Sequence, residues 1–372
     1  MHCGNKYIVK NSNSPKKIAL VGYSFGSGGG DRAMANLSVL FSDRGHEVHN
    51  IIIHNAFDYP YKGKLYNLGL VSSRFKLVHH FKRFWAFYKI FRTHKFDLII
   101  DFRFRLHLLN EFIIYFLVYN VRTIYTVHSF LTHVYVIPNR FFVKYLYKKL
   151  DALVTVSKTI EKELVLKYDF KNVSTIYNLL DRKSIELDAN EPLNIDEKFV
   201  LAVGRMQDNV KQFDVLIQGY AASVLPKNNV KLIILGWGNL ISEHQKLANR
   251  LQLNDLVIFT GKVSNPFPYY KKALFTVLTS KNEGFPTVLL ESLSCKTPVI
   301  AFDCLSGPNE IIVHKKNGLL IENQNINELI SGINLLFEDQ KLYQICKENA
   351  TMHLNQYEQE AIYEQWKKHI EK

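Results

Sequence analysis

The sequence predicts an α/β protein built from two doubly wound domains that face each other across a cleft. Three observations predict this fold class. At 372 residues the chain exceeds what one hydrophobic core usually organises, so two domains of ordinary size are expected. Apolar strands alternate with amphipathic helices in both halves, which is the order of parallel βαβ units. A polar and acidic stretch, residues 181–197, separates the halves.

The first half opens with an apolar strand, a glycine-rich loop and an amphipathic helix. The strand is expected at residues 17–23 and the loop at 26–30, and Gly45 ends the helix. Along that helix one face carries Ala33, Met34, Leu37, Leu40 and Phe41. Further strands are expected at residues 48–53, 97–101, 123–127 and 152–156.

The second half repeats the alternation more regularly. Strands are expected at residues 199–203, 231–235, 257–260, 274–278 and 299–302. Helices are expected at residues 213–225, 242–251, 287–294 and 326–337. We therefore expect Rossmann-like domains at residues 1–180 and 181–352, followed by a helix at 353–372 that packs back toward the first domain. Ligands of such open sheets bind at the carboxyl edges of the strands, in the cleft.

Composition and charge narrow the class of protein. Hydrophobic residues make up 47% and charged residues 22%, as in globular proteins. Residues 1–180 hold 26 Lys and Arg against 11 Asp and Glu, so the net charge of +13 lies in the first half. This charge favours an anionic membrane, a phosphate-bearing acceptor or nucleic acid. Residues 112–121, the longest apolar run, are too few to span a bilayer, and the N-terminus lacks the pattern of a secretory signal, so a cytoplasmic protein is expected.

The stretch with the most chemical information is Glu283-Gly-Phe-Pro-Thr-Val-Leu-Leu-Glu291. It places two carboxylates eight positions apart, across a loop and the first turn of a helix. Pro286 suits an early helical position, and the free amides around it form an anion site for a diphosphate. Glu291 would then accept the hydroxyls of a ribose, while Glu283 would face the group beyond the phosphates. Two acidic residues alone would more often mark an ordinary loop-to-helix junction.

The context favours the functional interpretation. The pair resembles the E-x7-E signature of the retaining glycosyltransferases of family 4, which have the two-domain GT-B fold. Other segments of the second half resemble stretches of that family in matching order: Val203-Gly-Arg205, Lys211 to Ile217, Leu232 to Gly238, Gly261 to Val263, Thr297 to Ala301 and Ser306 to Ile311.

The first half carries shorter matches. Gly28-Gly-Gly-Asp-Arg32 and Arg44 to Val48 resemble the family's first loop and the segment after its first helix. The strand that ends at His128 resembles the place where family members keep a histidine near the donor sugar. Two departures concern the phosphate-binding loop: Lys211 follows Arg205 by six positions rather than five, and Gln212 replaces the usual glycine.

The resemblance implies an enzyme that binds a nucleotide sugar in its second domain and an acceptor in its first. It implies catalytic roles for Glu283, Arg205, Lys211 and His128. It implies donor-binding roles for Gly28, Gly29, Val263, Gly284, Phe285, Pro286, Thr287, Val288 and Glu291. Because the chain lacks an Asp-x-Asp pair, we expect no metal and no cofactor, with the two cations and the helix N-terminus stabilising the leaving phosphate. The resemblance also implies a front-face reaction in which that phosphate accepts the proton of the acceptor.

The expected reaction is transfer of a hexose or N-acetylhexosamine, on UDP by resemblance, to a glycan or lipid-linked acceptor. The pathway would be synthesis of cell-envelope polysaccharide: capsule, O-antigen or lipopolysaccharide. Alternatives are a nucleotide-sugar epimerase or glycan phosphorylase on the same fold. A further alternative is a basic protein without enzymatic activity that binds membranes or nucleic acid. We expect no nucleic-acid partner, since no recognised motif for one is present.

Residues 74–95 hold seven Lys and Arg, seven aromatic residues and no acid. As a helix, this segment would place Phe81, Phe84, Trp85, Tyr88 and Phe91 along one face. That pattern is typical of an interfacial helix on an anionic membrane, which would make the protein peripheral on the inner face of the cytoplasmic membrane. An ordinary helix that packs these aromatics on the first sheet would show the same pattern, and both can be partly true.

Overall fold

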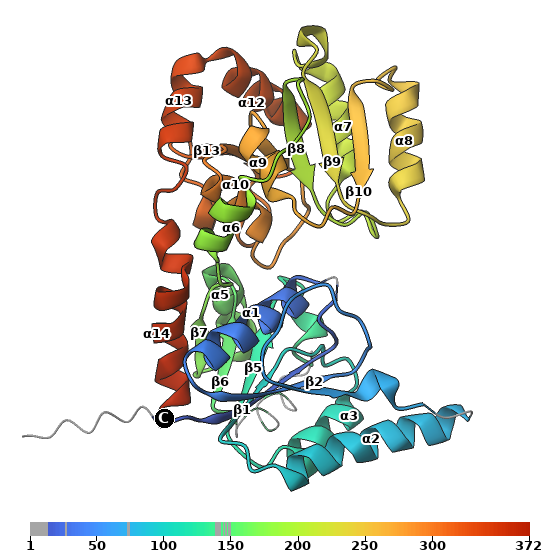
Figure 1. The fold of residues 1–372 in the computed structure, drawn as a ribbon, viewed down its shortest axis with the longest axis vertical. Helices are drawn as coiled ribbons and strands as arrows, with labels where there is room; N and C mark the ends of the chain where they lie inside the picture. Colours follow the sequence, from blue (N-terminus) through green and yellow to red (C-terminus); the bar gives the residue numbers. More distant parts are fainter. Residues whose placement is uncertain are drawn as a thin grey trace, which may run out of the picture. The chain divides into compact units, whose positions relative to one another are not determined.

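The computed structural model describes residues 14–26, 28–72, 75–137, 143, 145, 147 and 150–372. Two parallel sheets with flanking helices organise these residues (Figure 1). The first sheet has the strand order β3-β2-β1-β4-β5-β6-β7. Its strands are β1 (Lys17–Gly22), β2 (Glu47–Ile52), β3 (Lys64–Asn67), β4 (Leu98–Asp101), β5 (Thr123–Val127), β6 (Ala152–Thr155) and β7 (Val173–Thr175).

The first sheet forms because its central strands are continuous apolar runs, which suit a parallel sheet covered on both faces. In register, Ile18 of β1 pairs with Val48 on one side and with Leu98 on the other. The strand order turns back between β1 and β4, so these two neighbours form the topological switch point of this sheet. The helices of this half are α1 (Gly29–Asp43), α2 (Lys76–Thr93), α3 (Leu108–Ile113) and α5 (Lys158–Tyr168), with short turns η1 (Leu68–Leu70), η2 (Ile114–Val118) and η3 (Thr132–Val134).

The second sheet has the order β10-β9-β8-β11-β12-β13, with its switch point between β8 and β11. Its strands are β8 (Phe199–Val203), β9 (Lys231–Leu235), β10 (Val257–Gly261), β11 (Thr276–Leu278), β12 (Val299–Phe302) and β13 (Gly318–Ile321). The helices and turns of this half of the chain are α6 (Arg182–Asp188), α7 (Phe213–Ala222), η5 (Pro226–Asn228), α8 (Ile241–Arg250), α9 (Phe267–Lys272), α10 (Thr287–Ser294), α11 (Pro308–Ile311), α12 (Ile326–Glu338), α13 (Gln340–Glu348), η6 (Leu354–Tyr357) and α14 (Gln359–Ile370). Buried side chains of β8, β9, α7 and α12 form its main apolar core.

The alternation expected from the sequence is confirmed: each expected strand overlaps an observed one. Three strands were missed, namely β3, β7 and β13, each only three or four residues long. The residues of β3 and β7 are partly or fully exposed, so their hydrophobic pattern was weak. Within the described residues, every helix falls short of the length and apolar character that a bilayer span requires.

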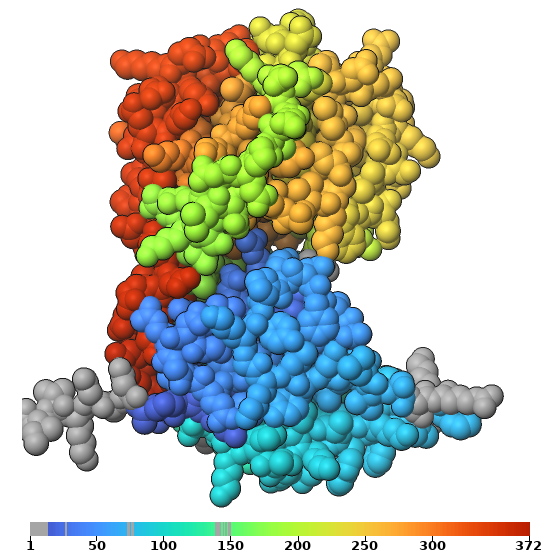
Figure 2. Space-filling view, viewed as in Figure 1, coloured from blue at the N-terminus to red at the C-terminus, as the bar shows by residue number. Residues whose placement is uncertain are grey.

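The chain divides into two compact units. Unit 1 takes the residues up to Thr126 together with Tyr135–Leu153 and Tyr363–Lys372, and unit 2 takes Val127–Val134 and Val154–Ile362. The domain boundary expected at residue 181 stays a prediction, and the second sheet begins with β8 at residue 199. Residues 182–199, light green in Figure 2, run over the surface of unit 2.

The end of α14 belongs to unit 1 and packs beside α1. Trp366 meets Phe41 edge to face, with ring centroids 5.9 Å apart. The hydroxyl of Tyr363 hydrogen-bonds to Nε2 of His46, at 3.1 Å. An aromatic pair of this kind adds about 0.5–1.5 kcal/mol beyond the area it buries, so these contacts hold the end of α14 against α1.

Candidate functional site

The predicted site residues of the second half gather at the switch point of the second sheet. Strand β8 ends at Val203 and its neighbour β11 ends at Leu278, so the loops after them start at the same sheet edge. One loop carries Arg205 and Lys211, and the other leads to Glu283. Carboxyl ends of strands at a switch point are where open α/β sheets bind ligands.

Backbone contacts tie these two loops together. The Lys281 N–H donates to the Val210 carbonyl at 2.8 Å. The Thr279 hydroxyl donates to the Lys211 carbonyl at 3.0 Å. As a result Nζ of Lys211 lies 2.5 Å from Oε1 of Glu283, and the Ser280 hydroxyl donates to the same oxygen at 2.6 Å. The structure thus brings together two predicted catalytic residues that are 72 positions apart.

Gln212 stands where the family usually has glycine, and its backbone conformation is one that favours glycine. It adopts a left-handed conformation, with φ of 48° and ψ of 50°, just before α7 begins at Phe213. Glycine is the usual residue there because it has no Cβ to clash, whereas an L side chain costs about 1–2 kcal/mol. The amide of Gln324 donates to Oε1 of Gln212 at 2.8 Å, and this bond partly offsets that cost.

The backbone on both sides of Arg205 is fixed while its side chain is exposed. The Gly204 N–H donates to the Leu235 carbonyl at 3.0 Å, and the Met206 N–H donates to the Trp237 carbonyl at 2.8 Å. A Cβ on Gly236 would fall 1.8 Å from the Gly204 oxygen, so only glycine allows this close approach. Arg205 is therefore presented to solvent from a rigid loop, available to an anion.

The loop that leads into α10 is built on close backbone contacts within unit 2. A Cβ on Gly284 would fall 2.0 Å from the His128 carbonyl oxygen. The Phe130 N–H donates to the Glu283 carbonyl at 3.2 Å, so the strand end predicted to hold a histidine lies against this loop. The Ser306 hydroxyl donates to the Gly284 carbonyl at 2.7 Å from the other side. These contacts fix Glu283 and the start of α10 with respect to the backbone of His128.

Helix α10 begins at Thr287, as expected, and Pro286 is its N-cap, one position before the early helical position that the sequence suggested for it. The first turn carries no acidic residue, which leaves the positive end of the helix dipole uncompensated by a side-chain charge. Phe285 is buried, whereas Thr287 and Val288 are half-buried at this end. The arrangement is suited to a phosphate group.

Glu291 lies one turn further along α10 and is buried, with 3% of its surface exposed. The hydroxyl of Tyr270 donates to its Oε2 at 3.1 Å. Tyr270 is held in turn by α9 and by the Thr297 hydroxyl, which donates to the Tyr270 carbonyl at 2.6 Å. The sequence analysis missed Tyr270 as well as Ser280 and Ser306. Only Ser306 had a signal, because it lies in a segment that resembles the family.

Three predicted donor-binding residues belong to other elements of the fold. Val263 follows β10, two strands from β8, and packs against the apolar cluster around Tyr270. Gly28 and Gly29 lie in unit 1 at the start of α1. A Cβ on Gly29 would meet nothing within 4 Å, so the fold itself does not require glycine there. The donor-binding roles of all three stay predictions.

Over the residues described, no group of three or more His, Cys, Asp or Glu side chains is placed to hold a metal ion. Burial raises the pKa of Cys304 to about 12, and the negative charge of Glu283 adds to this effect. The thiol is therefore protonated at neutral pH and a poor nucleophile.

Two family models match the chain. Residues 184–353 match the family described as glycosyl transferases group 1, and residues 27–184 match glycosyltransferase family 4. The Campylobacter jejuni enzyme N-acetylgalactosamine-N,N'-diacetylbacillosaminyl-diphospho-undecaprenol 4-alpha-N-acetylgalactosaminyltransferase is 36% identical over 214 residues. These residues cover 57% of this chain and 58% of that enzyme, so the chain spans a little over half the length of this curated relative.

Two further comparisons extend over almost the whole chain. The GalNAc-alpha-(1->4)-GalNAc-alpha-(1->3)-diNAcBac-PP-undecaprenol alpha-1,4-N-acetyl-D-galactosaminyltransferase of Campylobacter jejuni is 27% identical over 368 residues, which cover 95% of this chain and 98% of that enzyme. The crystal structure of HepE from Anabaena, in complex with UDP and glucose, superposes with a TM-score of 0.77 at 19% identity. That superposition covers 95% of this chain and 99% of HepE, and it shows a shared fold.

Proposed function

Because the chain belongs to the glycosyltransferases of group 1 and family 4, we propose that it transfers a sugar from a nucleotide sugar to a glycan or lipid-linked acceptor in cell-envelope polysaccharide synthesis. The donor is a UDP-linked hexose or N-acetylhexosamine, and the product retains the configuration of the donor sugar. The observation that carries the proposal is the pairing of Lys211 with Glu283 beside the N-terminus of α10, at the switch point of the second sheet.

Each group has a role in breaking the bond between sugar and diphosphate. This step develops negative charge on the leaving phosphate, and preorganised cations and dipoles stabilise that charge. Arg205 and the amides at the start of α10 supply positive charge from fixed backbone, and Lys211 adds its ammonium when the phosphate competes with Glu283 for it. Glu291 binds the ribose and is oriented by Tyr270. No metal takes part, and the leaving phosphate accepts the proton of the acceptor.

The relatives support the substrate classes. The name of the Campylobacter jejuni relative describes an acceptor that carries a diphospho-undecaprenol group and a transferred N-acetylgalactosamine. HepE was crystallised with UDP and glucose. A UDP-sugar donor and a lipid-linked glycan acceptor are therefore the first pair to test.

A transfer assay with a panel of nucleotide sugars and undecaprenyl-diphosphate-linked glycans tests the proposal. We expect one UDP-sugar to be consumed only when an acceptor is present, and the product to carry an α-linkage if the donor is α-linked. Interconversion of the donor sugar without an acceptor would indicate an epimerase, and release of sugar phosphate from a glycan would indicate a phosphorylase. The absence of any transfer, together with the absence of nucleotide binding, would refute the proposal.

We propose further that the protein docks on an anionic membrane through α2. The predicted segment starts at Arg74, outside the described residues, but α2 itself supports both interpretations of its aromatic residues. In the first half and the middle of α2, Phe81 and Trp85 are 67% and 56% exposed, whereas Phe91 near its end is 1% exposed and lies in the core. Exposed aromatics beside exposed Lys82 are typical of an interfacial helix.

Vesicle co-sedimentation tests the docking. The double variant Lys82→Glu and Lys89→Glu should lose binding to anionic vesicles at low salt, because each basic residue near the surface contributes about 1 kcal/mol. UDP binding should stay unchanged. Equal co-sedimentation of variant and wild type, or none by the wild type, would contradict the docking.

A further inference from the structure

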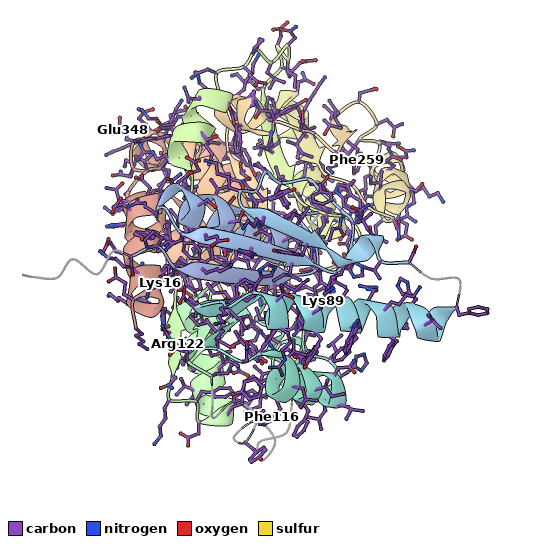
Figure 3. The ribbon with its side chains drawn as sticks, turned by 60° about the horizontal axis from the view of Figure 1, so that its bottom comes forward. Lys16, Lys89, Phe116, Arg122, Phe259 and Glu348 are labelled. Atoms are coloured by element: carbon purple, nitrogen blue, oxygen red, sulfur yellow. The ribbon has the colours of Figure 1, made fainter. Side chains whose placement is uncertain are left out.

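A cavity of about 650 Å³ lies in unit 1 between α2, α3 and the loop after β4. Its volume falls within the roughly 300–1,000 Å³ of small-molecule sites. Figure 3 shows α2, on which Lys89 is labelled, running beside α3 and η2, where Phe116 is labelled. The sequence analysis had no signal for this cavity, because its walls come from segments far apart in the chain.

The cavity occupies the ligand-binding edge of the first sheet. Tyr23 follows the end of β1, Ile53 follows the end of β2, and Arg103 follows the end of β4, and all three line it. Strands β1 and β4 are the neighbours at which the order of the first sheet turns back. The cavity therefore lies at the switch point of the first sheet, just as the loops that carry Arg205 and Glu283 lie at the switch point of the second sheet.

The walls of the cavity are mainly apolar. Phe81, Phe84 and Phe87 line it from one face of α2, while Leu106 and Ile113 line it from the opposite side. Leu106 and Phe81 are largely exposed although apolar, so part of the rim at which the cavity opens is apolar. An occupant with a long apolar part that arrives from a bilayer fits this opening.

The guanidinium of Arg83 borders the same cavity. Nη2 of Arg83 donates to the Ile53 carbonyl at 2.8 Å, which holds the guanidinium at the wall. His80 and His107 are exposed and also line the cavity. The acidic residue in the lining is Glu111, whose Oε2 lies 3.3 Å from Nη2 of Arg103. Arg103 also pairs with the buried Asp101 at 2.7 Å, so it faces two carboxylates, and the guanidinium of Arg83 supplies the positive charge for an anion such as phosphate.

We infer that this cavity binds the isoprenoid phosphate portion of the lipid-linked acceptor, with the first isoprene units between α2 and α3 and the phosphate beside Arg83. The inference rests on the proposed function, since it assigns that acceptor a binding site. The single cavity accommodates one hydrocarbon chain. An isoprenoid phosphate has one such chain, whereas a phospholipid has two acyl chains.

Calorimetry with farnesyl phosphate as a soluble probe tests the inference on the full chain. Wild-type protein should bind farnesyl phosphate, and farnesol or inorganic phosphate should each bind at least tenfold more weakly. Ile113→Trp, which fills the cavity, should weaken binding at least tenfold. Arg83→Gln should weaken binding of farnesyl phosphate severalfold and leave that of farnesol unchanged. Leu109→Trp is the matched control for Ile113→Trp, because Leu109 is exposed on α3 and lies outside the cavity lining, and the affinity of this variant should stay within twofold of wild type.

Other outcomes would overturn the inference. The inference is wrong if Ile113→Trp binds farnesyl phosphate as tightly as the wild type does, or if the wild type does not bind farnesyl phosphate. It is also wrong if dihexanoyl phosphatidylglycerol competes equally with farnesyl phosphate. The thermal midpoint and UDP binding are measured on every variant to show that both units are folded. If UDP binding and sugar transfer persist while the probe fails to bind, the cavity assignment is wrong and the proposed function stands. If no nucleotide sugar is used at all, the proposed function fails independently of the cavity.

Discussion

Replacing Glu291 with alanine should weaken the binding of UDP, because the carboxylate is expected to accept hydrogen bonds from the ribose. Hydrogen bonds to a charged group contribute about 1.5–3 kcal/mol. Since 1.4 kcal/mol corresponds to a factor of ten, the dissociation constant should rise by roughly 10- to 150-fold. Calorimetric titration with UDP measures this change directly.

The structure adds a second effect that must be separated from the first. The Tyr270 hydroxyl donates to Oε2 of Glu291, and both side chains are buried. Glu291→Ala leaves this hydroxyl without that acceptor, which costs about 1–3 kcal/mol of folding stability. Tyr270→Phe removes the hydroxyl but keeps the carboxylate, so it should weaken UDP binding by less than about tenfold.

The double variant distinguishes the two effects. Combining Tyr270→Phe with Glu291→Ala also removes the hydroxyl that has lost its bond to Glu291, so part of the lost stability should return in urea denaturation. Binding of UDP should remain as weak as in Glu291→Ala alone. If Glu291→Ala lowers stability but binds UDP like the wild type, the carboxylate serves only to hold Tyr270, and its role at the ribose is refuted.

Arg205→Ala should lower turnover by a factor on the order of 10² to 10³, because one fixed donor to the leaving phosphate is lost, and wild-type activity should survive excess EDTA. Abolition by EDTA with rescue by magnesium would contradict this. Gly284→Ala should destabilise the fold by about 1–3 kcal/mol, since its Cβ would meet backbone 2.0 Å away, whereas Gly29→Ala should cost nothing. Equal shifts of their thermal midpoints would rule this out. Burial lowers the pKa of His49, so below pH ~6.5 the unfolded chain takes up a proton that the folded chain does not, and stability should fall as pH falls. His49→Phe should flatten this dependence in urea midpoints at pH 7.5 and 5.5, and an unchanged slope would assign it to other groups.

The sequence was sufficient for most of the fold because the relevant signals are local. A buried parallel strand is a continuous apolar run, and an amphipathic helix repeats its apolar face along its own length. Strands such as Phe199–Val203 and the helix Thr287–Ser294 were therefore placed with the bounds they have. The short, partly exposed strands β3 and β7 were not predicted, because their residues form no such apolar run.

The sequence also indicated which residues belong to the candidate site. The two carboxylates of Glu283 and Glu291 flank a loop and a helix start, and that spacing alone indicates an anion site beside a helix dipole. The glycine at position 284 was part of the motif, but its reason was not visible. Only the folded chain shows that the His128 carbonyl would collide with any Cβ there.

Contacts between distant positions were decided by the tertiary structure alone. Lys211 meets Glu283 because β8 and β11 are neighbours in the sheet, although 72 residues separate the two side chains. Tyr270 reaches Glu291 because α9 and α10 pack together. Helix α2 carries one aromatic pattern along its length, yet Phe91 is buried and Phe81 is exposed. Burial depends on which other elements cover each turn of the helix, and a helical periodicity in the sequence holds no information about that cover.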